Sequence, residues 1–456
     1  MRILILQFVA PGRTGALPEF EHDLGVAAAM LRSDGFEPDL LAMAGHEPEA
    51  LREAINRSRP HQILAVVPPT HLTAARHTIM DVAEKHALPV GVVGRYATSQ
   101  PKDTISIPGV RWLIVGEFEH ALLGLLRLLR DAPAADLKVV PGVWANSAEG
   151  LVRNEPAPLI DDLDALPWPD REIFDYQRIV DATGQADFKA TRGCARWCAY
   201  CLNDWYMEAY AGCDGLVRRR SAADLLDEMA TVLGRYGGAR EVVFLGHAFA
   251  TDRPWLEAFA AEYPRRSALP YRCHVDLASV DRYVAALLAR SRCRAADVMI
   301  GSGSNFIREE VLGIRLRWPK IVSGAAALAK AGVGVHAHVF VGAPYESEVS
   351  VAETLDLLAR LDLQEVTPRV YYPVPGTRSA EMCADNGWIS GRGEENFFAA
   401  RSVLDMPSLP AERINEIARH FDSLLNRRRG RGLGGLLRRL RELGTTPLGR
   451  RAKRSR

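Results

Sequence analysis

Thr191-Arg-Gly-Cys194-Ala-Arg-Trp-Cys198-Ala-Tyr-Cys201 brings three of the seven cysteines of the chain onto one short segment, directly after an apolar strand predicted at 188–191. Three thiolates on one loop can each bind a different iron of a [4Fe–4S] cubane, which leaves the fourth iron without a protein ligand. A substrate can then coordinate that open iron. Gly193 allows a tight backbone turn before the first cysteine. The segment therefore predicts a reactive iron–sulfur site after the strand that begins an α/β unit.

A zinc site is the main alternative for these cysteines. Structural zinc takes four ligands, commonly from two close pairs, and a second C-x2-C pair is absent from the sequence. His247 or Cys213 would have to complete the site as a single distant ligand. The pattern therefore favours the iron–sulfur cluster.

Alternating strands and helices occupy two blocks of the chain. Residues 186–390 contain six predicted strands with helices between them, near 188–191, 241–245, 271–275, 297–300, 334–341 and 365–372. Six strand–helix units predict a partial barrel, short of the eight units of a closed barrel. Residues 1–131 alternate in the same way, which predicts a doubly wound parallel sheet that binds ligands at the carboxyl ends of its strands.

Two other segments lack this alternation. Residues 132–185 are rich in proline without a sustained period, which predicts a linker that wraps over the surface. Residues 391–456 are expected to form a helical extension with a basic tail. Residues 427–456 contain twelve Lys or Arg and one acidic residue, so this part carries a charge of +11. Residues 1–426 carry about −10 by difference.

The basic tail admits two interpretations. Leu433–Leu443 and its arginines are compatible with a basic amphipathic helix on an anionic membrane, and also with a solvated, partly disordered terminus. No aromatic residue follows Phe421, which disfavours nucleic acid as a partner because stacking platforms are missing.

The composition is that of a globular protein, with 48% hydrophobic and 25% charged residues over 456 positions, enough for two or three domains. The apolar run Arg2–Phe8 is too short for a signal peptide, and no run of about 18 apolar residues predicts a membrane span. Clustered cysteines in such a chain indicate metal ligation in a reducing compartment. We therefore expect a cytoplasmic protein.

The C-x3-C-x2-C spacing, with Tyr200 before the last cysteine, resembles the signature of the radical S-adenosylmethionine (SAM) superfamily. The resemblance implies a partial (β/α)6 radical SAM barrel whose cluster ligands and catalytic centre are Cys194, Cys198 and Cys201. It implies that the open iron chelates the methionine part of SAM, and that one electron then cleaves the sulfonium to a 5′-deoxyadenosyl radical. Tyr200 would lie beside the adenine.

Further motifs resemble the cobalamin-binding members of this superfamily. Leu166–Asp170 is similar to their Leu-Pro-x-Pro element, Val341–Glu346 to their Gly-x-Pro-x-Glu strand end, and Pro373–Thr377 to their Pro-x-Pro-Gly-Thr turn. Gly94–Thr98 and Gly116–Glu119 resemble elements of their Rossmann-like cobalamin-binding domain. By this resemblance, the corrinoid-contacting residues are Gly94, Thr98, Gly116 and Glu117.

Two positions depart from the family pattern. Phe244–Phe249 lacks the usual acidic residues, although Gly246 remains to meet the amino group of SAM. In Ile300–Ser304 a glycine, Gly301, replaces the family's glutamate, while Ser302 and Ser304 remain as implied SAM-binding residues. The Asp-x-His-x-x-Gly motif is also absent, which implies that no protein imidazole replaces the lower ligand of cobalt.

The resemblance as a whole implies a cobalamin-dependent radical SAM enzyme of the class B methyltransferase type. Such an enzyme transfers a methyl group from methylcobalamin to an unactivated carbon or phosphorus of a small-molecule substrate. The departures leave open a non-methylating radical reaction with the same cofactors, such as ring contraction, cyclisation or aminocarboxypropyl transfer. Either reaction requires an external electron donor of the flavodoxin or ferredoxin type.

Two other functional classes fit less well. A transfer RNA methylthiotransferase would need a second cluster on N-terminal cysteines, and no cysteine precedes Cys194. A simple electron carrier would protect all four irons with protein ligands.

Overall fold

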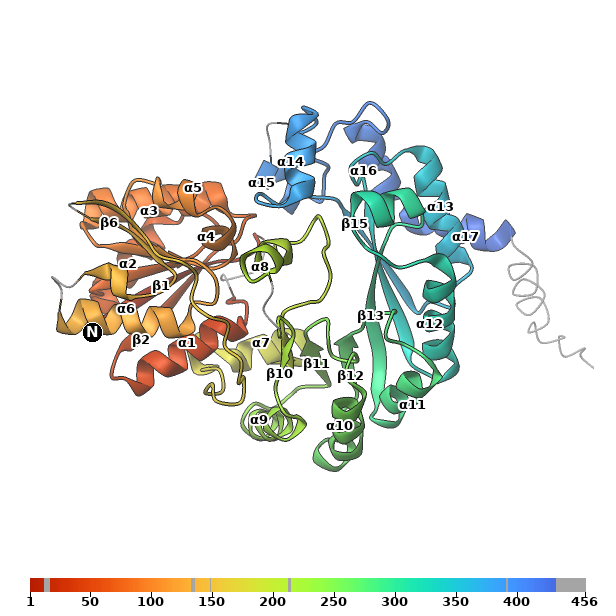
Figure 1. The fold of residues 1–456 in the computed structure, drawn as a ribbon, viewed down its shortest axis with the longest axis horizontal. Coiled ribbons are helices and arrows are strands. Elements are labelled where there is room, and N and C mark those ends of the chain that lie inside the picture. The colour runs from red at the N-terminus through yellow and green to blue at the C-terminus, as the bar shows by residue number, and fades with distance from the viewer. Residues whose placement is uncertain (12–16, 133–135, 148, 212–214, 391–392, 432–456) are drawn as a thin grey trace, which may run out of the picture.

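The computed structural model describes residues 1–431 except 12–16, 133–135, 148, 212–214 and 391–392. Two α/β units lie next to each other, and the last two helices of the described chain pack on the far side of the second unit (Figure 1). Among the described residues, no helix is both long and apolar enough to cross a bilayer.

The N-terminal unit is a seven-stranded sheet in the order β2-β1-β3-β4-β5-β6-β7. Its first five strands pair in parallel, as the sequence predicted: β1 (Arg2–Phe8), β2 (Glu37–Met43), β3 (Gln62–Val66), β4 (Val90–Val93) and β5 (Val110–Ile114). The helices between them are α1 (His22–Ser33), α2 (Pro48–Ser58), α3 (Leu72–His86), α4 (Arg95–Ser99), α5 (Pro101–Ile105) and α6 (Glu119–Asp131). Side chains on both faces of the central strands are buried, as in a sheet covered by helices on both sides.

Residues 132–185 are more structured than the linker that the sequence predicted. After a short turn, η1 (Leu137–Val139), the hairpin β6 (Val143–Ser147) and β7 (Gly150–Arg153) extends the N-terminal sheet antiparallel to β5. The linker prediction was wrong here because strands of four or five residues are too short to give a detectable period. A second turn, η2 (Glu172–Phe174), and α7 (Tyr176–Thr183) then lead into the second unit.

The second unit is a six-stranded sheet in the order β15-β14-β13-β12-β11-β8, parallel throughout. Its strands are β8 (Gln185–Lys189), β11 (Glu241–Leu245), β12 (Tyr271–His274), β13 (Cys293–Gly301), β14 (Gly334–Val341) and β15 (Glu365–Val370). Helices lie on its outer side, namely α9 (Ala222–Arg235), α10 (Arg253–Arg266), α11 (Arg282–Arg290), α12 (Trp318–Lys330) and α13 (Glu348–Ala359) (Figure 1). This arrangement confirms the predicted partial barrel.

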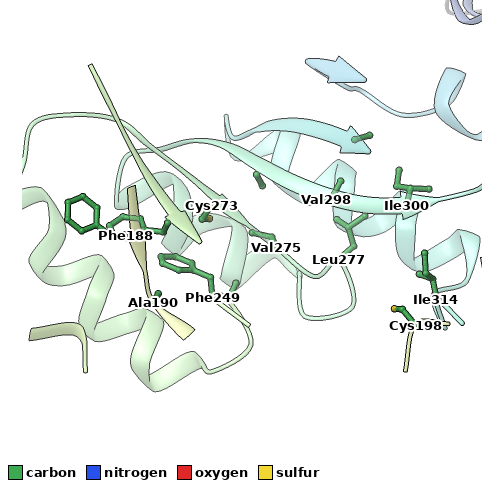
Figure 2. Close-up of a cluster of buried hydrophobic side chains, with 14 of the residues drawn as sticks. Phe188, Ala190, Cys198, Phe249, Cys273, Val275, Leu277, Val298, Ile300 and Ile314 are labelled. Atoms are coloured by element: carbon green, nitrogen blue, oxygen red, sulfur yellow. The ribbon is translucent and has the colours of Figure 1, made fainter. Parts of the chain in front are cut away.

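An apolar core fills the space between these strands and their helices. Figure 2 shows Phe188 and Phe249 at one end of this cluster and Ile314 with Cys198 at the other. Cys198 of the cysteine segment therefore reaches the barrel core and holds that segment against it.

The C-terminal extension is helical as far as the structure describes it. It consists of α14 (Arg378–Asp385), α15 (Gly393–Phe398), α16 (Ala411–Arg419) and α17 (Phe421–Arg431). The possible basic helix over Leu433–Leu443 lies outside the described residues.

Buried ion pairs join the two units. Arg192, in the two-residue strand β9 (Thr191–Arg192), pairs with Asp23 of α1 at 2.9 Å and with Glu119 of α6. Arg218, in the antiparallel partner strand β10 (Arg218–Arg219), donates to both carboxylate oxygens of Glu117 at 2.7 and 2.8 Å. Buried charges are tolerated only when they are paired, so these contacts fix the orientation of one unit on the other.

Candidate functional site

The cysteine segment leaves β9 through a tight turn at Gly193. This residue has a φ of +78°, and a Cβ atom there would overlap the carbonyl oxygen of Leu216. No other amino acid fits this position without displacing the β9–β10 ribbon. The turn therefore fixes the direction in which the segment leaves the barrel.

The loop from Cys194 to Cys201 is held in shape by its own polar contacts. The Asn203 side-chain amide donates to the carbonyl oxygens of Cys194 at 3.0 Å and Arg196 at 3.2 Å. The backbone N–H of Asn203 approaches the Cys201 sulfur at 3.5 Å. An N–H group aimed at a sulfur stabilises its thiolate form, which is the form that binds iron.

The three thiols are free and lie close enough to affect one another electrostatically. Burial, followed by the neighbouring thiols of Cys201 and Cys194, raises the pKa of Cys198 to about 12. Burial also raises the pKa of Cys194. Like charges gathered on one loop are costly unless a cation neutralises them, so this donor set fits a cluster of several iron ions.

The donor set does not form a mononuclear metal site. Within the described ranges, no three His, Cys, Asp or Glu side chains converge closely enough to hold one metal ion. A cubane needs no such convergence, because each thiolate binds a different iron. For the zinc alternative, Cys213 lies outside the described residues, and the His247 ring stacks on His274 at a centroid distance of 5.3 Å.

Two distant segments clamp the cysteine loop from either side. The Ala199 N–H donates to the Leu312 carbonyl at 3.0 Å, and the Ala199 carbonyl accepts from the Ser379 N–H at 3.0 Å. Gly313 has a φ of +71°, and a Cβ there would overlap the Trp197 carbonyl oxygen. The loop is thus fixed by residues more than a hundred positions away in the sequence.

Tyr200 lies between the thiols and the barrel wall. Its ring packs edge-on against Phe340 of β14 at a centroid distance of 5.0 Å, and its hydroxyl is within hydrogen-bonding reach of the Cys198 thiol. The structure therefore brings Tyr200 to the predicted cluster. Its role beside an adenine remains a prediction.

Gly246 is placed next to the start of the loop. It has a φ of +116°, and a Cβ there would overlap the Thr191 hydroxyl oxygen. The position therefore requires glycine for packing alone, whether or not its backbone also meets SAM.

The two predicted serines lie at the end of β13 and have internal partners. The Ser302 hydroxyl lies 3.2 Å from the Thr354 hydroxyl and accepts from the Ser304 N–H at 3.2 Å. Both serines are buried. Their contacts shape the turn after β13, and a contact with SAM stays a prediction.

Three of the four predicted corrinoid residues gather at the carboxyl edge of the N-terminal sheet. The Thr98 hydroxyl accepts from the Gly116 N–H at 3.1 Å, and the Thr98 N–H donates to the Gly94 carbonyl at 3.1 Å. Both glycines have positive φ, +101° and +93°. Residues with a Cβ adopt these backbone conformations only under strain, and Gly116 is buried. A contact of this edge with a corrinoid stays a prediction.

The fourth residue, Glu117, has a different role. Both of its carboxylate oxygens accept from Arg218, and one also accepts from the Ile160 N–H at 3.0 Å. The carboxylate is therefore occupied at the domain junction, and the expected corrinoid contact of Glu117 stays a prediction. Its partner lies 101 residues further along the chain, so local sequence gave no sign of the pairing.

An aromatic helix follows the cysteines and lies between the two units (Figure 1). In α8 (Asn203–Ala209), Trp205 packs against the core of the N-terminal unit. The hydroxyl of Tyr210 donates to the Ala157 carbonyl at 2.7 Å, and a Cβ at Gly116 would lie 3.1 Å from it. The cluster loop and the edge that carries Gly94 and Gly116 therefore face a common, aromatic-lined junction.

A group of polar residues on the inner face of the barrel was not predicted from the sequence. We call this group, Asp297 with His274, His336, His338 and His247, the polar wall. Val335, Ala337 and Val339 of β14 pack in the core beneath the helices, so the alternate residues His336 and His338 face inward. Asp297 of β13 lies 3.5 Å from a ring nitrogen of each. The alternating His-x-His pattern on a predicted strand was the available signal.

A second pair of histidines continues this wall. His274 at the end of β12 lies 4.0 Å from Asp297 and stacks on His247. Burial, with the neighbouring His247, lowers the pKa of His274 to about 4. The wall therefore gathers the His274, His336 and His338 rings around the Asp297 carboxylate, and such a polar surface can hydrogen-bond a polar substrate.

Comparisons with known proteins agree with this geometry. Residues 188–358 match the Radical SAM superfamily. An uncharacterized methyltransferase of Pyrococcus horikoshii is 21% identical over 363 residues, which cover 78% of this chain and 77% of the relative.

Two solved structures share the fold of both units. One is the radical SAM methyltransferase TsrM from Kitasatospora setae, solved with cobalamin and a [4Fe–4S] cluster bound. The two structures match with a TM-score of 0.66 and 17% sequence identity, over 84% of this chain and 75% of TsrM. The other is the cobalamin-dependent SAM radical enzyme OxsB with aqua-cobalamin and SAM bound; its TM-score is 0.63 at 15% identity, over 92% of this chain and 61% of that one.

Proposed function

We propose that this chain, a radical SAM enzyme whose superfamily domain spans residues 188–358, methylates a small-molecule substrate with the aid of cobalamin. The observation that carries the proposal is the loop of three free thiols at the barrel entrance, facing a doubly wound unit with a glycine-lined edge. When bound, a [4Fe–4S] cluster supplies the electron that cleaves SAM, and cobalamin supplies the methyl group.

The chain's own residues would hold these groups in place. Cys194, Cys198 and Cys201 are the proposed iron ligands, and they must lose their protons to bind, so cluster assembly releases protons. Tyr200, Gly246, Ser302 and Ser304 are the proposed contacts to SAM.

The proposed corrinoid contacts are Gly94, Thr98 and Gly116 at the edge of the N-terminal sheet. The ion pairs of Arg192 and Arg218 keep this edge at a constant distance from the barrel, and the aromatic residues of α8 exclude water between the two units. A dry, fixed junction protects a radical from side reactions.

A non-methylating radical reaction with the same cofactors is the second candidate. The observation that favours it is the stacked pair His247 and His274, in which His247 follows Gly246 where the family has acidic residues. Product analysis separates the two, because only methyl transfer yields a methylated product together with S-adenosylhomocysteine.

Anaerobic reconstitution with iron, sulfide and hydroxocobalamin tests the proposal. We expect roughly four irons and one corrinoid per chain, and SAM cleavage to 5′-deoxyadenosine after reduction. Cys198→Ala should abolish cleavage, whereas Cys383→Ala, a buried cysteine of α14 outside the loop, should keep it. Iron without corrinoid would refute the cobalamin part alone, and cleavage by Cys198→Ala would refute the assignment of the cluster.

A further inference from the structure

Four arginines and one tryptophan surround the cysteine loop on the outside of the barrel. We define the loop face as Trp197, Arg196, Arg315, Arg317 and Arg378. The Arg196 guanidinium donates to the Arg315 carbonyl at 3.2 Å, and Arg378 donates to the Trp197 carbonyl at 3.3 Å. These contacts tie Arg315 and Arg378 to the cysteine loop, and Arg317 lies two positions from Arg315 with the buried Leu316 between them.

The loop face is positive on an otherwise acidic body. The three segments that meet there, 194–201, 312–317 and 376–379, contain four arginines and no Asp or Glu, whereas residues 1–426 carry about −10. Arg196 and Arg378 are each paired with a carboxylate, Asp276 and Asp204. Across the described part of the chain, no carboxylate pairs with the exposed Arg315 and Arg317.

Trp197 joins this charge to the predicted cluster. Its side chain is 43% exposed, although it immediately precedes Cys198, which is 8% exposed. An exposed large aromatic ring next to arginines, two of them paired and two without a carboxylate partner among the described residues, is a usual composition for a protein-binding surface, where Trp and Arg are enriched. At the loop face, a buried proposed cluster ligand, Cys198, is thus directly bonded to a solvent-exposed residue, Trp197.

We propose that the loop face docks an acidic one-electron carrier protein, of the flavodoxin type, that reduces the cluster. This inference rests on the proposed function, because a cluster that cleaves SAM must be reduced from outside. One electron passes from the reduced carrier to the cluster, so the carrier is oxidised by one electron and the cluster reduced by one. No covalent bond forms or breaks.

The charge of the loop face fits such a transient partner. Electron-transfer complexes use small interfaces, below about 1,200 Å² in total, and their charged rims set the association rate more than the affinity. Arg315 and Arg317 need no rearrangement to meet a carboxylate, because neither has a carboxylate partner to give up within the described residues.

Charge reversal tests this docking site in the full-length, reconstituted protein. The test variant is Arg315→Glu/Arg317→Glu, and the matched control is Arg52→Glu/Arg111→Glu, which changes the charge equally at two exposed arginines of the N-terminal unit. Stopped-flow absorbance records cluster reduction by reduced flavodoxin and, separately, by photoreduced 5-deazariboflavin, a small neutral reductant that needs no docking site.

We expect the second-order rate constant with flavodoxin to fall at least about tenfold at low ionic strength in the test variant only, in keeping with electrostatic steering. The rate with deazariboflavin should stay unchanged in every protein. Added salt should slow the wild type and leave the test variant nearly unaffected.

Three results would overturn the inference. Equal rate constants with flavodoxin in the wild type and the test variant would exclude the loop face as the docking site. An equal fall of the rate constant in the control variant would show that the effect comes from the net charge of the protein and not from the loop face. A loss confined to a tail variant, Arg450→Glu/Arg451→Glu/Arg454→Glu, would assign docking to the C-terminal tail. If deazariboflavin finds no cluster to reduce in the wild type, it is the proposed function that fails.

Discussion

Glu346 makes the stability of the barrel depend on pH in a direction opposite to that of most carboxylates. The residue follows β14, its side chain is fully buried, and one carboxylate oxygen accepts from the Gly342 N–H at 2.5 Å. Burial raises the pKa of Glu346 to about 8, from an ordinary value of 4.5. In the unfolded chain the group ionises near pH 4.5, whereas in the folded protein it keeps its proton until about pH 8.

The sign and size of the effect follow from this difference. Between pH 4.5 and 8 the folded state binds one more proton than the unfolded state, so the free energy of unfolding falls as pH rises. A difference of about 3.5 pH units corresponds to about 5 kcal/mol over the whole window. Stability from this group is complete below pH 4.5 and lost progressively up to pH 8.

Glu346→Gln removes this dependence, because the amide stays neutral at every pH and its oxygen can still accept from Gly342. Urea unfolding of the apo-protein at pH 5 and pH 8 measures it: the wild type should lose several kcal/mol more between the two conditions than the variant. Glu365→Gln, at an exposed carboxylate of β15, is the matched control and should behave like the wild type. The same loss in Glu346→Gln as in the wild type would refute the reasoning.

Three further outcomes can be checked directly. Arg192→Gln leaves the buried carboxylate of Glu119 without its cation, while Asp23 keeps its pair with Lys189, so the variant should cost about 3 to 5 kcal/mol in urea unfolding. Arg32→Gln, whose side chain is 47% exposed, should cost less than about 1 kcal/mol. Gly193→Ala should reduce the iron bound per chain to near zero because a Cβ overlaps the Leu216 carbonyl, while Gly234→Ala in the open part of α9 should keep full iron content. The His274 ring should titrate near pH 4 in NMR spectra, and a midpoint above pH 6 would contradict the burial described for it.

Local patterns in the sequence were enough to predict the strands and the cluster. The alternation along Gly334–Val341 extends over eight residues and gives a period, and Val90–Val93 is a short run dominated by valine that needs no period to be recognised. The cysteine spacing is a property of one short loop, so it needs no knowledge of the fold. Both kinds of signal are complete within about ten residues.

Features made by distant residues were not predictable. The hairpin Val143–Arg153 was missed because its strands are short and become regular only by pairing with β5. The role of Glu117 was missed because it depends on Arg218. The wall around Asp297 arises from the register of β12, β13 and β14, and the His-x-His alternation on β14 gave a sign of one strand of it but not of the pairing.

The ion pairs of the junction also bear on how the chain folds as it is made. Glu119 is synthesised 73 residues before Arg192, which is a delay of about 4 to 15 seconds at 5–20 residues per second. By then strands β1 to β7 have all been synthesised, because β7 ends at Arg153. During the delay Asp23 and Glu119 remain hydrated anions on the surface of the nascent sheet, so the charges that later hold the two units together first keep it soluble.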